Sequence, residues 1–297
     1  MPPPSSGPPP NPPAPQPTAG DAAPTGATLA ERIERLLGPL GGRSAVAARA
    51  FPAGATQPAT TPTPAAREIL LRASDPFPAA SLAKLPLAVE VLRRVDLGAL
   101  HWAERFDLGA APRAGGGSVL DTLDPTWRPS LADLCALMLS VSDNTAANML
   151  LDLVGMGEVN ETATRLGLTA TRLQRLFMDA AARAAGRDNL TTAGDMLTLL
   201  ALLRGDAVPG AARLRGLLQH DPLTEATTSD LPSTAELAHK GGALDDTIHA
   251  AGLLAGPGGA CAYCVLTTQQ RDLPLATLVC ARVLRLLWDA WCAPVPA

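Results

Sequence analysis

Residues 77–86 read FPAASLAKLP and place Ser81 three positions before Lys84. Two later stretches complete the pattern, Ser142-Asp143-Asn144 and Lys240-Gly241-Gly242. On a helix, positions i and i+3 share a face, so the Lys84 amine can reach the Ser81 hydroxyl. A lysine can take the proton from a serine when burial or neighbouring positive charge disfavours its own charge. The three stretches together predict an acylating centre built on serine and lysine, without a catalytic histidine.

The surroundings of these motifs resemble those of a known family. Leu85-Pro86 follows Lys84, and Leu134-Cys135-Ala136-Leu137-Met138 precedes the second motif. The intervals from Ser81 to Ser142 and from Ser81 to Lys240 are also similar to those of the family. On these residues, positions 28–292 resemble the class A β-lactamases and the penicillin-binding enzymes, including the related serine hydrolases.

The order of secondary structure predicts an α+β fold with three layers. Strands are expected at 45–51, 68–73, 237–243, 248–255 and 260–268, with a long helix over 81–94 and mainly helices over 95–220. Strands at both ends with helices between them imply one antiparallel sheet built from both termini and an inserted helical subdomain. The sheet part is expected at 28–80 and 221–292 and the helical part at 81–220. The resemblance implies the β-lactamase/transpeptidase-like fold.

Composition narrows the class of protein. The 297 residues are 47% hydrophobic and carry a net charge of −4, which disfavours nucleic acid as a partner. Residues 2–17 contain ten prolines, so residues 1–27 are expected to form a disordered tail. This tail lacks the basic start and apolar stretch of a secretory signal. Unless the natural chain starts further upstream, the sequence favours a cytoplasmic location. No membrane span is predicted, and a monomer is expected.

Five cysteines offer a possible metal site that strand geometry disfavours. They are Cys135, Cys261, Cys264, Cys280 and Cys292. An odd number without a secretion signal favours reduced thiols. Cys261 and Cys264 have zinc-ligand spacing, but positions i and i+3 of a strand point to opposite faces. We therefore expect no metal and no cofactor.

The resemblance implies a role for each motif residue in acylation. Ser81 is the expected nucleophile, and a desolvated Lys84 is the expected general base. Ser142 would relay a proton to the leaving nitrogen, and Asn144 would hold a substrate amide.

The resemblance also implies how substrate is held beside the third motif. Lys240 would supply positive charge near Ser142 and the substrate carboxylate, beside Gly242 where substrate lies close to backbone. The backbone N–H groups of Ser81 and Ala243 would form the oxyanion hole. Some family members have a substrate-facing arginine nine residues after the motif lysine, and the resemblance implies that His249 replaces it as a substrate-binding residue.

The chain departs from the family pattern in the loop 171–190. Members with strong β-lactamase activity carry a glutamate after a Thr-Arg-Leu-x-Arg run, and it activates the deacylating water. The run is present at 171–175, but the place of the glutamate is taken by Phe177 and that of a later asparagine by Ala181. Asp179 is the nearest carboxylate. The resemblance further implies that Arg175 and Asp188 pair at the neck of this loop.

A second departure concerns the third motif, where Gly241 replaces the hydroxyl residue of the family. Acylation is therefore expected, with slow deacylation. The first interpretation is a β-lactamase-like serine hydrolase. The second is a penicillin-binding peptidase or esterase-like enzyme acting on an amide or ester that is not a β-lactam, such as a cell-wall-like peptide. The third is a weakly catalytic protein that captures an acyl ligand as a sensor or scaffold.

Overall fold

The structure is a computed structural model that describes residues 27–52, 67–109, 111–219 and 225–294. The expected tail at 1–27 lies outside these residues except at Ala27. Among the described residues, no helix is long and apolar enough to cross a membrane.

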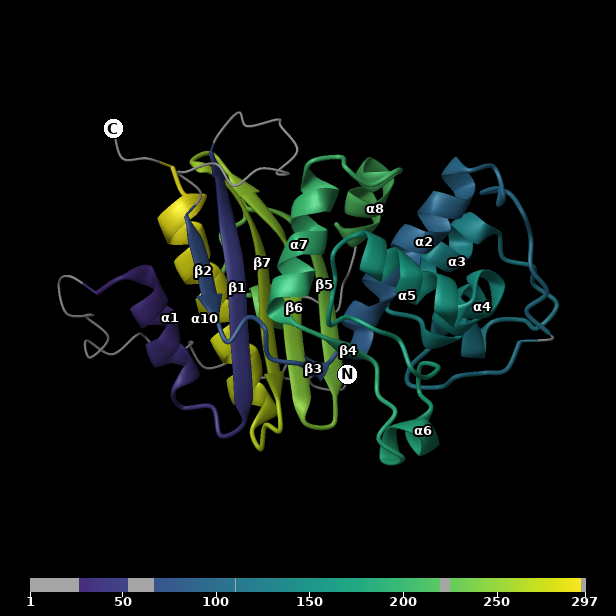
Figure 1. Cartoon of the computed structure of the whole chain (residues 1–297), viewed down its shortest axis with the longest axis horizontal. Coiled ribbons are helices and arrows are strands. Elements are labelled where there is room, and N and C mark those ends of the chain that lie inside the picture. The colour runs from purple at the N-terminus through teal and green to yellow at the C-terminus, as the bar shows by residue number, and fades with distance from the viewer. Residues whose placement is uncertain (1–26, 53–66, 110, 220–224, 295–297) are drawn as a thin grey trace, which may run out of the picture.

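A five-stranded antiparallel sheet forms the centre of the described chain (Figure 1). Its strand order is β2-β1-β7-β6-β5, so the first two strands pair with the last three, and β1 lies directly beside β7. This topology confirms the expected sheet built from both ends of the chain. The strands are β1 (Arg43–Pro52), β2 (Glu68–Leu71), β5 (Glu236–Leu244), β6 (Thr247–Gly256) and β7 (Gly259–Thr268).

Each face of the sheet packs against helices. Helices α1 (Leu29–Leu37) and α10 (Leu273–Trp291) cover one face, and α7 (Ala193–Arg204) lies against the other (Figure 1). Strand β7 alternates between the two cores, because Cys261 packs on the α10 side and Cys264 on the α7 side. The two thiols thus point away from each other, as expected for a strand.

The helical part lies beyond α7 (Figure 1). Its helices are α2 (Lys84–Asp96), α3 (Leu131–Ser140), α4 (Asn144–Val154), α5 (Met156–Arg165), α6 (Ala180–Ala184) and α8 (Ala211–Leu218). The short helix α9 (Glu225–Thr228) packs against α10 instead. Two short 3-10 turns, η1 (Ala80–Ala83) and η2 (Val119–Thr122), and a two-stranded ribbon of β3 (Phe77–Pro78) and β4 (Leu190–Thr191) complete the described elements.

The expected long helix from Ser81 is wrong at its start, because Ser81 lies in the 3-10 turn η1 and α2 begins at Lys84. Pro86 explains the change. Proline has no backbone N–H, so it cannot make the α-helical bond to the Leu82 carbonyl that a helix from Ser81 would need. In the observed register, Pro86 occupies the first turn of α2, where no such bond is required.

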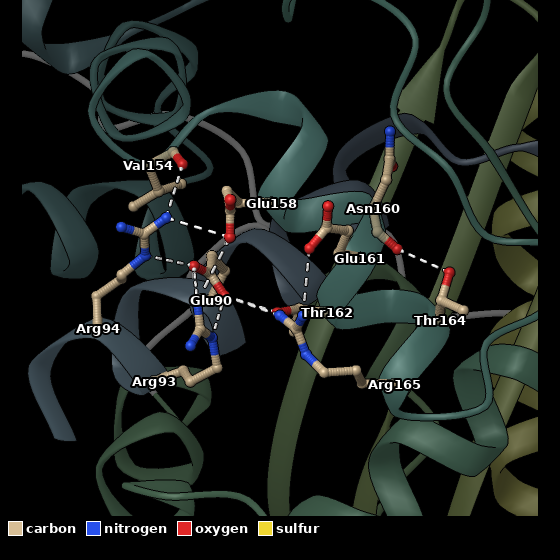
Figure 2. A network of polar contacts seen from close by, with 10 residues as sticks. All are labelled: Glu90, Arg93, Arg94, Val154, Glu158, Asn160, Glu161, Thr162, Thr164 and Arg165. Carbon is tan, nitrogen blue, oxygen red and sulfur yellow. Dashed lines mark hydrogen bonds and ion pairs between the residues drawn. The ribbon is translucent and has the colours of Figure 1, made fainter. Parts of the chain in front are cut away.

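A buried carboxylate holds the middle of α2 against α5 (Figure 2). The Glu90 side chain is 0% exposed and accepts hydrogen bonds from Arg93 Nε and Arg94 Nε, both at 2.7 Å, and from Thr162 Oγ1 at 2.6 Å. Because α2 also carries Lys84, this network stabilises the helix on which the candidate site is built.

Replacing Glu90 should destabilise the fold in a pH-dependent way. Burial raises the pKa of the Glu90 carboxyl, but hydrogen bonds from Arg93, Thr162 and Arg94 outweigh it and bring the pKa below 4.5. The carboxylate therefore stabilises the fold above about pH 4.5, and this contribution is lost as the pH falls through the lowered pKa. Glu90→Ala should cost about 1–3 kcal/mol at pH 7, because it removes the acceptor of the buried Thr162 hydroxyl and of two partly exposed arginines that keep Glu158 as a partner.

Urea unfolding at pH 7 and at pH 3.5 checks this prediction. The free-energy gap between wild type and Glu90→Ala should shrink at the lower pH. The control is Glu161→Ala, since Glu161 is exposed and pairs with Arg165 across one helical turn, which is worth little. Equal losses in the two variants would contradict a special role for Glu90.

Candidate active site

Ser81, Lys84 and Ser142 form a compact hydrogen-bonded triangle. Ser142 Oγ donates to Ser81 Oγ at 2.9 Å. Lys84 Nζ lies 3.0 Å from Ser142 Oγ and 3.3 Å from Ser81 Oγ. The structure thus brings together the first two sequence motifs, which are distant along the chain. A proton on Ser81 has a direct path to the lysine nitrogen and a second path through the Ser142 hydroxyl.

Unusual backbone conformations position the two serines. Ala80, directly before Ser81, has φ of 47°, and Ser142 has φ of 57°. Both values lie in the left-handed region, which costs residues other than glycine about 1–3 kcal/mol and is maintained only where the surroundings impose it. Asp143 supplies part of that restraint, since its carboxylate accepts from Ala146 N and Leu120 N. The hydroxyl of Ser142 is thereby held at the start of α4.

Lys84 is fully buried at 0% exposure and is surrounded by acceptors. Besides the two serine hydroxyls, the Ser142 carbonyl and Asn144 Oδ1 lie within hydrogen-bonding distance of Nζ, the latter at 2.8 Å. The Phe177 ring covers the same nitrogen, with its centroid 5.1 Å away. An ammonium formed by proton transfer would therefore be stabilised by fixed oxygens and by the ring face.

Strand β5 forms the wall opposite the helical part and approaches Ser81 closely at Gly242. A Cβ atom at position 242 would lie 3.2 Å from Ala80 Cβ and 3.3 Å from Ser81 N, so a side chain there would press on the serine. Lys240 is buried on the same strand, and its Nζ donates to Gly241 O at 3.2 Å. Ser81, Ser142, Asn144, Lys240, Gly242 and Ala243 all line one pocket of about 840 Å³.

His249 lines the pocket, and both of its ring nitrogens contact backbone atoms. Nε2 lies 2.7 Å from Pro78 O, and Nδ1 lies 3.0 Å from Ile248 O and 3.2 Å from Thr267 N. Burial is the largest effect and lowers the pKa of His249 to about 4. The ring therefore stays neutral between pH 5.5 and 8. Its contact with Pro78 O ties β6 to the segment before Ser81, and the substrate-facing role of His249 stays a prediction.

The neck of the 171–190 loop is closed as predicted. Arg175 Nε donates to Asp188 Oδ1 at 2.8 Å, and a second guanidinium nitrogen lies 2.8 Å from the same oxygen. Asp179 lines the pocket but is engaged as the N-cap of α6, where it accepts from Ala182 N at 2.9 Å. Ala181 is exposed on α6, directly after the lining residue Ala180.

Two residues that support the site had no role in the sequence interpretation. Asn148 on α4 holds the backbone of Phe177, accepting from its N–H at 2.8 Å and donating to its carbonyl at 3.1 Å. Ser118 is buried, and its hydroxyl accepts from the N–H groups of Asn144 and Thr145. Both side chains form hydrogen bonds to backbone atoms of other segments, and a sequence motif does not show such contacts.

The described residues contain no group of three or more His, Cys, Asp or Glu side chains that could hold a metal ion. All five cysteines are buried thiols.

The antiparallel sheet, the inserted helical part and the Ser-Lys-Ser triangle define the class of β-lactamases and penicillin-binding proteins. The chain belongs to the beta-lactamase enzyme family, whose model matches residues 31–291.

Individual relatives agree with this assignment. A β-lactamase of Streptomyces fradiae is 31% identical over 188 residues, which cover 60% of this chain and 61% of the relative. The crystal structure of a β-lactamase from Sphaerobacter thermophilus superposes with a TM-score of 0.78 at 26% identity, covering 88% of this chain and 96% of that one. An ancestral class A β-lactamase has a TM-score of 0.77 at 27% identity and covers 89% and 100%.

Proposed function

We propose that the chain is a serine hydrolase that forms an acyl-serine intermediate with a β-lactam or a related amide, and that it releases the acyl group slowly. The triangle of Ser81, Lys84 and Ser142 carries this proposal, since all three reacting groups lie within 3.3 Å of one another. Membership of the beta-lactamase enzyme family supports the substrate class.

Acylation follows from the positions of the three groups. Lys84 in its neutral form accepts the Ser81 proton, directly or through Ser142, while Ser81 Oγ attacks the carbonyl carbon of the substrate. The Ser81 and Ala243 N–H groups are proposed to bind the oxyanion, which fits the close approach of β5 to Ser81 N. Ser142 then passes the proton from the Lys84 ammonium to the leaving nitrogen. Lys240 attracts a substrate carboxylate from the same wall of the pocket.

Deacylation lacks a comparable base. Phe177 lies over Lys84 where a carboxylate would be needed, and its ring can neither accept a proton nor orient water. Asp179, the nearest alternative, is already used to cap α6. The acyl-enzyme should therefore outlive the acylation step.

A penicillin-binding peptidase or esterase-like enzyme is the second candidate, favoured by Gly241. At this position the family hydroxyl that would contact a β-lactam carboxylate is absent, although a Cβ there would make only ordinary contacts, with His239 Nε2 at 3.7 Å and His249 O at 3.8 Å. Turnover of a peptide or ester with only stoichiometric capture of β-lactams would favour this candidate. Acylation without turnover of any substrate would favour a sensor.

A carboxylate at position 177 should accelerate deacylation. In wild type, a chromogenic β-lactam should give a burst of one equivalent followed by slow turnover, with the acyl adduct visible by intact mass. Phe177→Glu should speed the slow phase by about 10²-fold or more, the usual contribution of a general base, and change the burst rate less.

The matched control is Phe177→Gln, which is as polar and as long but cannot act as a base. Asp179→Asn tests the alternative base, and it should leave the slow phase nearly unchanged. Fast hydrolysis by wild type without a burst or a trapped adduct would refute slow deacylation.

A further inference from the structure

Two buried thiols meet at the end of α10 and do not line the pocket of the motif residues. Cys292 Sγ lies 3.9 Å from Cys261 Sγ and 3.7 Å from Leu254 O. Both side chains are 0% exposed. Cys261 belongs to β7, and Cys292 is the C-cap of α10, so the pair joins the sheet to the helix that covers it.

The backbone around Cys292 is fixed against the β6–β7 turn. Gly258 N donates to Cys292 O at 2.9 Å, and Cys292 N donates to Trp288 O at 2.9 Å. Glycine at position 256 lets the end of β6 pack closely against the Cys292 backbone, because a Cβ atom at position 256 would lie only 2.6 Å from Cys292 O. The two sulfurs are therefore held in contact by backbone bonds on both sides, which gives a reaction between them the advantage of proximity.

We propose that Cys261 and Cys292 are a modification site, where a hydroperoxide converts the two thiols to an intramolecular disulfide. A disulfide needs sulfurs about 2.05 Å apart, so the thiols must approach by about 2 Å, partly by rotation about their Cα–Cβ bonds. The bond would link α10 to β7, close a loop over residues 261–292 and fasten the C-terminal helix to the sheet.

The chemistry balances with one hydroperoxide. The Cys292 thiolate attacks the peroxide, an S–O bond forms as the O–O bond breaks, and the thiol proton leaves with the departing oxygen as water or alcohol. Cys261 sulfur then attacks the sulfenic acid, and the S–S bond forms as the S–O bond breaks and water leaves. Two thiols lose two electrons to the peroxide. The hydrogen bond with Cys261 lowers the pKa of Cys292, which suits it to the first attack.

The other three thiols lie too far from Cys261 and Cys292 to form a disulfide with either of them. Cys264 faces the opposite side of the sheet, and Cys135 lies in α3 within the helical part. Cys280 is on α10 but more than three helical turns before Cys292, which is about 18 Å along a helix.

The test counts free thiols in the full chain. After removal of reductant, the protein is treated with hydrogen peroxide, quenched, unfolded and alkylated with iodoacetamide. The five thiols of the reduced chain should fall to three, and peptide mapping should recover one cross-linked species joining Cys261 to Cys292. The melting temperature should rise by up to about 10 °C and return on reduction.

Two variants define the site. Cys292→Ala should keep four alkylated thiols after peroxide, whereas Cys280→Ala, a buried cysteine of the same helix, should still lose two. The cross-linked peptide from wild type decides the matter if a variant fails to fold. Five alkylated thiols, a different pair, or a lower melting temperature in the cross-linked protein would overturn the proposal.

Discussion

Ser81→Ala should abolish covalent labelling by a β-lactam or by a fluorophosphonate probe. The variant removes the only oxygen through which the proposed acyl bond forms, while the methyl side chain fits the turn η1 without a clash. In the proposal Ser142 is a proton path and not a nucleophile, because its Oγ contacts both Ser81 Oγ and Lys84 Nζ. Intact mass should show the adduct in wild type and no adduct in the variant.

Ser44→Ala provides the matched control for this loss. Ser44 is also a largely buried serine, but it lies on β1 and contacts Arg72 instead of the pocket. It should label like wild type, and both variants should unfold cooperatively. An adduct that persists in Ser81→Ala and maps to another serine would end the assignment of the nucleophile.

Lys84→Arg should reduce the acylation rate by about 10²- to 10⁴-fold, the range that general base catalysis usually contributes. Arginine keeps the positive charge and can still bond Asn144 Oδ1, but its guanidinium does not release a proton in proteins. A loss therefore reports on proton transfer and not on charge. The rate of mass gain after mixing with a chromogenic β-lactam measures it.

Lys240→Arg is the control that separates the loss of proton transfer from any loss of rate caused simply by placing a larger cation in the pocket. Lys240 is also buried but has only an electrostatic role in the proposal, so its replacement should weaken substrate binding more than the acylation step. An acylation rate of Lys84→Arg within a few-fold of wild type would count against the lysine as base.

The scarcity of lysine in the sequence is a further signal that marks positions of the candidate site. The chain has 24 basic residues, of which only Lys84 and Lys240 are lysines. Both are buried, one in the Ser-Lys-Ser triangle and the other in the pocket wall. An arginine serves equally well on a surface, but it cannot supply a neutral amine, so these two positions stand out.

The fold could be predicted from repeating strand and helix patterns, whereas Ser142 was joined to Ser81 and Lys84 only through the resemblance of the motifs to a known family. Strand patterns at the two ends determined the sheet, and the spacing of Ser81 and Lys84 placed their side chains on one face. The start of α2 was missed although its cause, Pro86, is visible in the sequence. Its missing N–H limits how far the α-helix can extend toward Ser81.

The environment of His249 could not be predicted, because it depends on a contact with a segment far away in the chain. A strand pattern shows which face a residue occupies, and it does not show that Pro78 O and Thr267 N would engage both ring nitrogens. Ser118 and Asn148 were missed for the same reason. They bond to backbone atoms whose positions are known only once the loops are folded.

The pairing of β1 with β7 also limits the order in which the strands of the sheet can pair while the chain is being synthesised. Arg43 lies opposite Thr268, so most of the described chain separates the two paired strands. During synthesis, β1 can pair with β2 early. Its other edge stays unpaired until β7, near the end of the described chain, has been made. Such distant pairing slows folding and leaves an unpaired strand exposed to other chains. Chains interrupted before β7 should therefore aggregate, and Lys240 joins Ser81 only late in synthesis.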